Sequence, residues 1–281
     1  MDFELPDNAH TLFLVFSFVF GSMIGSFLNV CVHRLPLGLS VFKPRSRCPK
    51  CENSIAWYDN IPMVSWLILG AKCRNCGQPI SWQYPLVEAI TGTLFLLVYW
   101  RFGLTPATPI YMAYCAAMVV VTFVDLTDWT IPNEITYPGI PLGIGLSVVA
   151  MVYPASGLQF DQPVWAIAAA FGAGGFLYML DKASLVLLGK RGMGFGDVKL
   201  IAMVGAFFGP WGAALTIVVA SVVGSAVGIP MMIADRRKAG QSEGTYLPFG
   251  PYLCVGSLVV LFYGRQIVDL YTGYLQVPGV L

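Results

Sequence analysis

The chain is poor in charged residues. Only 11% of its 281 residues are Asp, Glu, Lys or Arg, whereas a soluble domain of this size carries roughly 25%. Hydrophobic residues make up 57% of the chain, and the mean hydropathy is +0.70. This composition excludes an ordinary soluble globular protein and indicates a membrane protein.

Other features that the chain lacks narrow the range of possible functions. The chain has only two histidines, at the two ends of the first apolar segment, so no Ser-His-Asp or Cys-His catalytic arrangement is apparent. No G-x-G-x-x-G sequence follows a strand, which leaves a Rossmann nucleotide site unsupported. The formal net charge is only +1, so the overall balance does not indicate nucleic acid as a partner.

Apolar segments, in contrast, are abundant. Many are near the ~20 residues needed to cross the hydrocarbon core, although some are shorter and interrupted by Gly or Pro. The sequence therefore predicts an all-α polytopic membrane protein with about eight transmembrane helices. We place these helices at about 12–32, 86–101, 107–125, 134–153, 164–188, 197–209, 211–234 and 247–264.

The distribution of Lys and Arg predicts the orientation. The loop after the first helix is rich in positive residues, and alternation places Lys190, Arg191, Lys199 and the cluster at 236–238 on the same side. That side should be the cytoplasm, and both termini should face outward. Residues 1–33 are acidic before the apolar run and basic after it, which favours a retained first helix over a cleaved signal peptide.

One polar segment, at about 34–83, is the only candidate soluble subdomain, and residues 84–281 form the remaining membrane domain. The polar segment contains the two C-x-x-C pairs Cys48/Cys51 and Cys73/Cys76. Each pair can present two thiolates to a single tetrahedral ion, and zinc is the usual occupant. A loop of this size cannot bury a sizeable core, and four thiolates leave no open position on the metal, so the predicted zinc is structural.

Two alternatives concern this loop. The cysteines could form reducible disulfides or redox motifs, although disulfides are disfavoured in the cytoplasm. The loop could also be a zinc ribbon that binds nucleic acid, because basic residues surround the cysteines. Topology and the proximity of anionic lipid already explain those charges.

Two carboxylates lie at the ends of apolar segments, where an acidic side chain is costly enough to indicate function. Asp125 closes the run in "VVVTFVDLTDWTIPNEIT", and Asp197 follows "GMGFG". Alternation puts both on the same membrane face, and paired aspartates that share a proton and a water are the machinery of an aspartic peptidase. Gly194 and Gly196 would let an extended substrate backbone approach closely.

Simpler roles remain open for each carboxylate. Asp197 could merely cap a helix, and Asp125 could be an interfacial residue at a helix end. Spacing alone does not rank Asp125 over Asp128. A carboxylate-dependent transporter is a further alternative, but it would more naturally place acids at the bilayer midplane and show inverted repeats.

Several segments together resemble the bifunctional type IV prepilin peptidases, which are GxGD-type intramembrane aspartic peptidases. The matching segments span nearly the whole chain and occur in the family's order, with the tetracysteine loop between the first two helices. They are "GSFLNVCVHRLP" at 25–36, "CPKC" with "IAWYDNIPMVSWLILGAKCRNC" at 48–76, "ISWQYPLVE" at 80–88, "DLTDWTIPN" at 125–133, "GMGFGDVKL" at 192–200 and "PFGPYL" at 248–253.

The resemblance implies that Asp125 and Asp197 are the catalytic pair. It implies cleavage of the basic leader from prepilins and pseudopilins of type IV pilus and type II secretion systems, at the cytoplasmic face of the bacterial inner membrane. It also implies methylation of the new amino terminus with S-adenosylmethionine as donor. Family members commonly have Arg where this chain has Gln83, a departure that concerns the methylation half.

Overall fold

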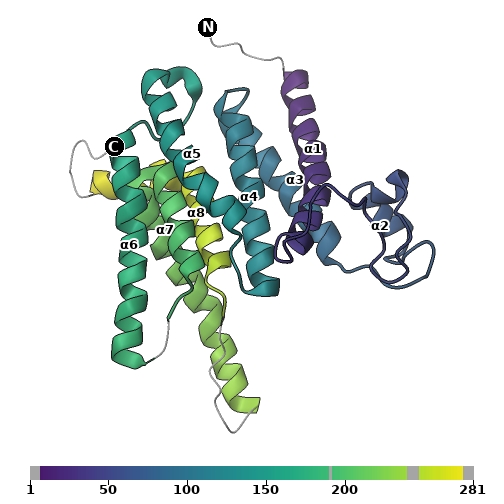
Figure 1. The fold of residues 1–281 in the computed structure, drawn as a ribbon. Coiled ribbons are helices and arrows are strands. Elements are labelled where there is room, and N and C mark those ends of the chain that lie inside the picture. The colour runs from purple at the N-terminus through teal and green to yellow at the C-terminus, as the bar shows by residue number, and fades with distance from the viewer. Residues whose placement is uncertain (1–6, 190–191, 239–246, 275–281) are drawn as a thin grey trace. The chain divides into compact units, whose positions relative to one another are not determined.

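A computed structural model describes residues 7–189, 192–238 and 247–274 of the chain. It divides into two compact units, Met1–Val124 and Asp125–Leu281. Within the described residues all regular structure is helical, apart from two isolated bridges in the polar loop (Figure 1). Seven of the described helices are long and apolar enough to cross a membrane. The prediction of an all-α, multi-pass membrane protein is therefore confirmed.

The first unit is built on a close pair of helices, α1 (Asp7–Arg34) and α3 (Gln83–Phe102). Glycines bring the two backbones together, since a Cβ atom on Gly25 would lie only 2.7 Å from the Cα atom of Glu88. Close approach at small residues is the usual way in which membrane helices associate. The helix α4 (Ala107–Asp128) follows, and its residues after Val124 belong to the second unit.

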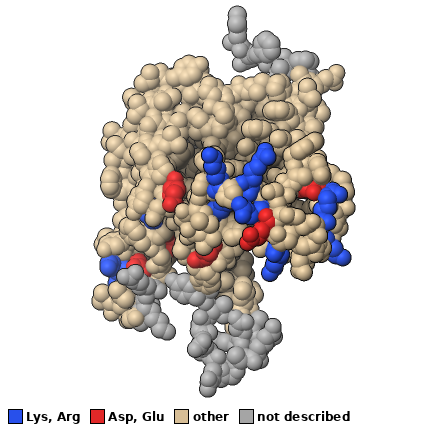
Figure 2. All heavy atoms as spheres, turned by 45° about the vertical axis from the view of Figure 1, so that its right-hand side comes forward, with Lys and Arg blue, Asp and Glu red and all other residues tan. Residues whose placement is uncertain are grey.

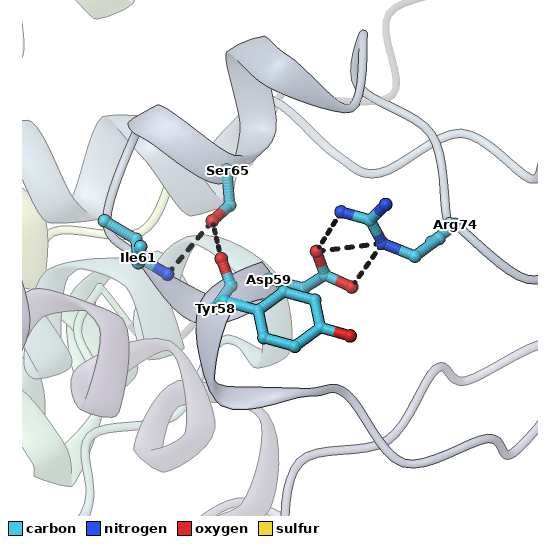
Figure 3. A network of polar contacts seen from close by, with 5 residues as sticks. All are labelled: Tyr58, Asp59, Ile61, Ser65 and Arg74. Carbon is cyan, nitrogen blue, oxygen red and sulfur yellow. Dashed lines mark hydrogen bonds and ion pairs between the residues drawn. The ribbon is translucent and has the colours of Figure 1, made fainter.

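The polar loop between α1 and α3 contains a 3-10 helix, η1 (Trp57–Asn60), and a short helix, α2 (Val64–Ile68). Ser65 fixes the turn between them, because its Oγ donates to the carbonyl of Tyr58 (2.8 Å) and accepts from the N–H of Ile61 (3.1 Å). Arg74 reaches back to Asp59 with a shortest N–O distance of 2.6 Å (Figure 3). Polar contacts thus hold this loop together where apolar burial is small.

The second unit contains α5 (Asn133–Val152), η2 (Pro154–Ser156), α6 (Pro163–Leu188), α7 (Phe195–Lys238) and α8 (Gly250–Tyr274). The helix α7 is central, because it packs against α5, α6 and α8. Lys190 and Arg191, on which the predicted orientation partly depends, lie outside the described residues.

The helix α7 consists of two antiparallel arms. Gly209, at φ 70° and ψ −170°, breaks the helix just before Pro210, and only glycine adopts such a backbone at little cost. Both ends of α7 lie at the same end of the unit, which carries the amino-terminal end of α8 (Figure 1). The two arms correspond to the predicted segments 197–209 and 211–234.

Candidate active site and metal centre

The two predicted catalytic aspartates lie in the second unit, at one end of its helices. Asp125 is in the last turn of α4 and Asp197 is in the first turn of α7. Each is only 6% exposed. Both line one cavity of about 380 Å³. The structure therefore brings together two buried carboxylates that are 72 residues apart in the sequence.

A backbone N–H group holds each carboxylate. Gly250, the first residue of α8, donates to Oδ2 of Asp125 over 3.1 Å. Gly194, just before α7, donates to Oδ2 of Asp197, also over 3.1 Å. Such hydrogen bonds fix the carboxylates without placing a second charge beside them. No role was predicted for Gly250, although it belongs to the segment "PFGPYL".

Ile131 packs against the backbone on both sides of the pair. A Cβ atom on Gly196 would lie 2.9 Å from Cβ of Ile131, and one on Gly250 would lie 3.1 Å from its Cδ1. The close approach that Gly196 permits here is thus to Ile131 within the chain. Both Gly194 and Gly196 line the cavity, and the approach of a substrate to them stays a prediction.

The cavity distinguishes Asp125 from Asp128, the other candidate for the catalytic pair. Asp128 is exposed, and its Oδ2 accepts a hydrogen bond from the hydroxyl of Thr127 (2.7 Å). It is not among the residues that line the cavity, whereas Asp125 is. Trp129, which follows Asp128, has a left-handed φ of 57° and marks the end of α4. The geometry therefore favours Asp125 as the partner of Asp197.

Two charged residues near the site were not singled out as functional from the sequence. Asp181, near the end of α6, accepts a hydrogen bond from the N–H of Met193 (3.3 Å) and so supports the loop before Asp197. Lys199 lines the cavity, hydrogen-bonds to Oδ1 of Asn133 and lies over the ring of Tyr137, 5.0 Å from its centroid. It thereby ties the first turns of α5 and α7 together. The only feature of the sequence that could have placed Lys199 near the site was its position two residues after Asp197.

The four predicted metal ligands lie together in the first unit. The sulfur atoms of Cys48, Cys51, Cys73 and Cys76 all lie within 4.8 Å of one another. Cys48 and Cys76 are 3.9 Å apart at sulfur, which matches the roughly 3.8 Å edge of a tetrahedron with Zn–S bonds of about 2.3 Å. The cysteines are free thiols. This donor set and spacing fit a zinc ion.

The two C-x-x-C turns have the same backbone pattern. The N–H of Cys48 donates to the carbonyl of Asn53 (2.9 Å), and the N–H of Cys73 donates to the carbonyl of Gln78 (2.8 Å). In each turn, the residue after the second cysteine has a positive φ, 57° at Glu52 and 68° at Gly77. The chain thus presents the two pairs of thiols from equivalent turns.

Backbone donors favour the thiolate form at the first turn. The N–H groups of Cys51 and Lys50 lower the pKa of the Cys48 thiol. The N–H of Asn53, followed by the side-chain amide of Asn75, lowers the pKa of Cys51. Because only the thiolate binds a metal ion, these contacts favour metal binding by the first turn. At the second turn, the backbone N–H of Gln78 lowers the pKa of Cys76, but burial and the neighbouring thiols together outweigh it and raise that pKa to about 11.

Glu88 is a further carboxylate within a predicted apolar segment, 86–101. It is buried in α3, and its Oε2 accepts a hydrogen bond from the N–H of Met63 (2.7 Å). Met63 directly precedes α2 and has a left-handed φ of 57°. Glu88 therefore attaches the polar loop to the α1–α3 pair.

Comparison with known proteins covers both units. The profile of the bacterial peptidase A24 N-terminal domain matches residues 19–102, and that of the type IV leader peptidase family matches residues 112–229. A prepilin leader peptidase/N-methyltransferase from Myxococcus xanthus is 40% identical over 243 residues, which cover 86% of this chain and 70% of the relative.

Relatives of the same name occur in other bacteria. The protein of Stutzerimonas stutzeri is 32% identical over 282 residues, which cover 92% of this chain and 93% of the relative. That of Pseudomonas aeruginosa is 32% identical over 290 residues, which cover 95% of each chain. No solved structure matches the chain.

Proposed function

Because the chain belongs to the type IV leader peptidase family, we propose that it cleaves the leader of prepilins and pseudopilins and methylates the new amino terminus. The observation that carries the peptidase half is the pair of buried carboxylates, Asp125 and Asp197, at one cavity. Both lie in terminal turns of their helices, away from the midplane position that a transporter would favour.

The pair acts by general acid–base catalysis. One carboxylate takes a proton from a water molecule as the water oxygen bonds to the scissile carbonyl carbon, and the other, protonated, donates to the carbonyl oxygen. When the tetrahedral intermediate collapses, the carbonyl re-forms, the C–N bond breaks and the leaving amine takes up a proton. The hydrogen bonds from Gly194 and Gly250 keep both carboxylates in place during these steps.

The cleavage takes place at the cytoplasmic face of the bacterial inner membrane. The Lys- and Arg-rich loop between α1 and α3 supports this orientation through the positive-inside rule. A substrate whose basic leader stays in the cytoplasm would present its scissile bond at that face. Residues of the loop before Asp197 also line the cavity at the ends of α4 and α7.

The names of the relatives support the methyltransferase half and S-adenosylmethionine as the methyl donor. The cysteine cluster holds a structural Zn²⁺ in this proposal. Cys48, Cys51, Cys73 and Cys76 would fill all four positions of a tetrahedral ion and leave none for a substrate. When bound, the ion supplies folding energy to a loop that buries little apolar surface.

The test is co-expression with a type IV prepilin, followed by mass measurement of the pilin's amino terminus. Asp125→Asn and Asp197→Asn should each abolish cleavage yet still methylate a pilin that has been cut beforehand, because methyl transfer needs no hydrolytic water. Asp128→Asn, at an exposed site outside the cavity, is the matched control and should cleave normally. Cleavage by Asp125→Asn together with an inactive Asp128→Asn would overturn the assignment.

A further inference from the structure

The short helix α2 exposes an apolar face. Val64, Leu67 and Ile68 are 47%, 70% and 75% exposed. On the other side of the helix, Ser65 is buried, and the indole N–H of Trp66 donates to the carbonyl of Ile80 (3.2 Å). The helix is therefore attached to its own loop by one face only. An apolar face of this kind, in a loop that also exposes Trp57 and Trp82, indicates a binding surface.

The position of α2 along the length of α1 and α3 indicates what surrounds it. Met63, just before α2, donates its N–H to Glu88, and Glu88 lies five residues after Gln83, where a membrane-spanning helix begins. At 1.5 Å per residue this is about 7.5 Å inside the end of α3. In Figure 1 α2 lies to the side of α1 and α3, at the level of their lower halves and not beyond their ends. The loop is thus folded back along the membrane-spanning helices.

The loop around α2 is strongly basic. Two acidic residues, Glu52 and Asp59, stand in segment 34–83. Seven basic residues accompany them, namely Arg34, Lys43, Arg45, Arg47, Lys50, Lys72 and Arg74. Figure 2, in which the side with the loop is turned forward, shows blue side chains over the middle and right of that face. This charge complements anionic lipid headgroups.

We propose that α2 is an interfacial helix that inserts Val64, Leu67 and Ile68 among the lipids bordering α1 and α3, while the loop's Lys and Arg side chains contact anionic headgroups. Tryptophans are enriched at the membrane–water interface, and Trp57 and Trp82 would lie at that depth in this arrangement. A second copy of the chain fits this face less well, because symmetry would bring two positively charged loops together. The inference rests on the membrane topology and not on the proposed function.

Photo-crosslinking of the full-length protein tests this inference. p-Benzoylphenylalanine is placed at Leu67, at Ile68 in a second variant, and at the exposed Asn53 of the first C-x-x-C turn as the matched control. Each variant is irradiated in nanodiscs of phosphatidylcholine with phosphatidylglycerol and in nanodiscs of phosphatidylcholine alone, and adducts are identified by mass. The zinc content of each variant reports whether the loop is folded, and the second position serves if the first loses zinc.

The expected result is a lipid adduct at Leu67 or Ile68 that is several-fold more abundant than at Asn53 and that decreases when phosphatidylglycerol is omitted. An adduct with another part of the same chain, or a crosslinked dimer, would show that protein covers this face and would overturn the proposal. So would equal lipid labelling at all three positions. Equal labelling in the two kinds of nanodisc would contradict the role of the basic residues.

Discussion

The N–H of Gly250 donates a 3.1 Å hydrogen bond to Oδ2 of Asp125, and a Cβ atom at position 250 would lie only 2.5 Å from the same oxygen. Gly250 is thus a glycine for two reasons, since its backbone holds the carboxylate and a side chain would displace it. The relationship joins the first residue of α8 to the last turn of α4.

Gly250→Ala should therefore impair cleavage strongly. The added methyl group displaces Asp125, and a misplacement of about 1 Å at a catalytic group costs on the order of 100-fold in rate. The measurement is the initial rate of prepilin cleavage by inserted protein. The control is Gly145→Ala, since a Cβ atom on Gly145 meets nothing within 4 Å. Equal rates for the two variants would show that Gly250 does not position Asp125.

Asp181 should support catalysis through the loop before Asp197. Its carboxylate accepts the N–H of Met193, and the next N–H, of Gly194, holds Asp197. Loss of one such hydrogen bond costs roughly 1 kcal/mol, so Asp181→Ala should lower the cleavage rate by about five-fold. Asp181→Asn keeps an oxygen acceptor and should retain most of the rate. If Asn is as damaging as Ala, the hydrogen bond is not the cause.

Removal of the metal should affect the polar loop and spare the aspartate pair. Cys48→Ser combined with Cys51→Ser removes two of four thiolates, and metal analysis should show loss of zinc from the protein. The loop should then become sensitive to protease, while correctly inserted protein still cleaves. Cys115→Ser, at a buried thiol in α4 outside the cluster, should keep its zinc. A complete loss of cleavage in inserted, zinc-free protein would contradict a purely structural metal.

The ion pair of Asp59 and Arg74 should make a small, pH-dependent contribution to the loop. Hydrogen bonds from Arg74 lower the pKa of Asp59, so the stabilisation is fully present above the ordinary aspartate pKa of about 3.9 and is lost as pH falls through the lowered value. At neutral pH, Asp59→Asn should speed zinc release to a chelator by less than about three-fold, because the Arg74 side chain is 58% exposed and water screens the pair. The ratio of the two release rates should approach one in acid. A ratio that grows as pH falls would contradict the expected pH dependence of this stabilisation.

Local patterns in the sequence predicted much of the fold. Long apolar segments predicted the membrane helices, and the break at Gly209 was foreseen from a Gly-Pro interruption between two apolar runs. Two C-x-x-C pairs predicted a cluster because each pair is fixed by a single turn. The five-residue helix α2 was not predicted, since it is too short to show a period and depends on the contact of Met63 with Glu88.

The candidate site was less accessible to such reasoning. Asp125 and Asp128 lie on the same helix end, and only its rotation in the fold makes Asp125 buried and Asp128 exposed. Gly250 meets Asp125 across 125 residues of chain, and no spacing rule connects a glycine between two prolines with a distant carboxylate. Contacts of this kind are set by tertiary packing, which a single sequence does not display.

The break at Gly209 also bears on the bilayer itself. The first arm of α7, from Phe195 to Phe208, has 14 residues and rises roughly 21 Å, against a hydrocarbon core of about 30 Å. From position 197 to 208 the side chains of this arm are buried or half-buried, and α7 packs against α5, α6 and α8, so the arm need not span the hydrocarbon core in contact with lipid. Non-helical backbone such as the buried turn at Gly209 is tolerated at membrane depth where protein surrounds it. The chain can thus double back inside the unit, and the far end of α7 returns to the end of the unit at which Asp197 lies.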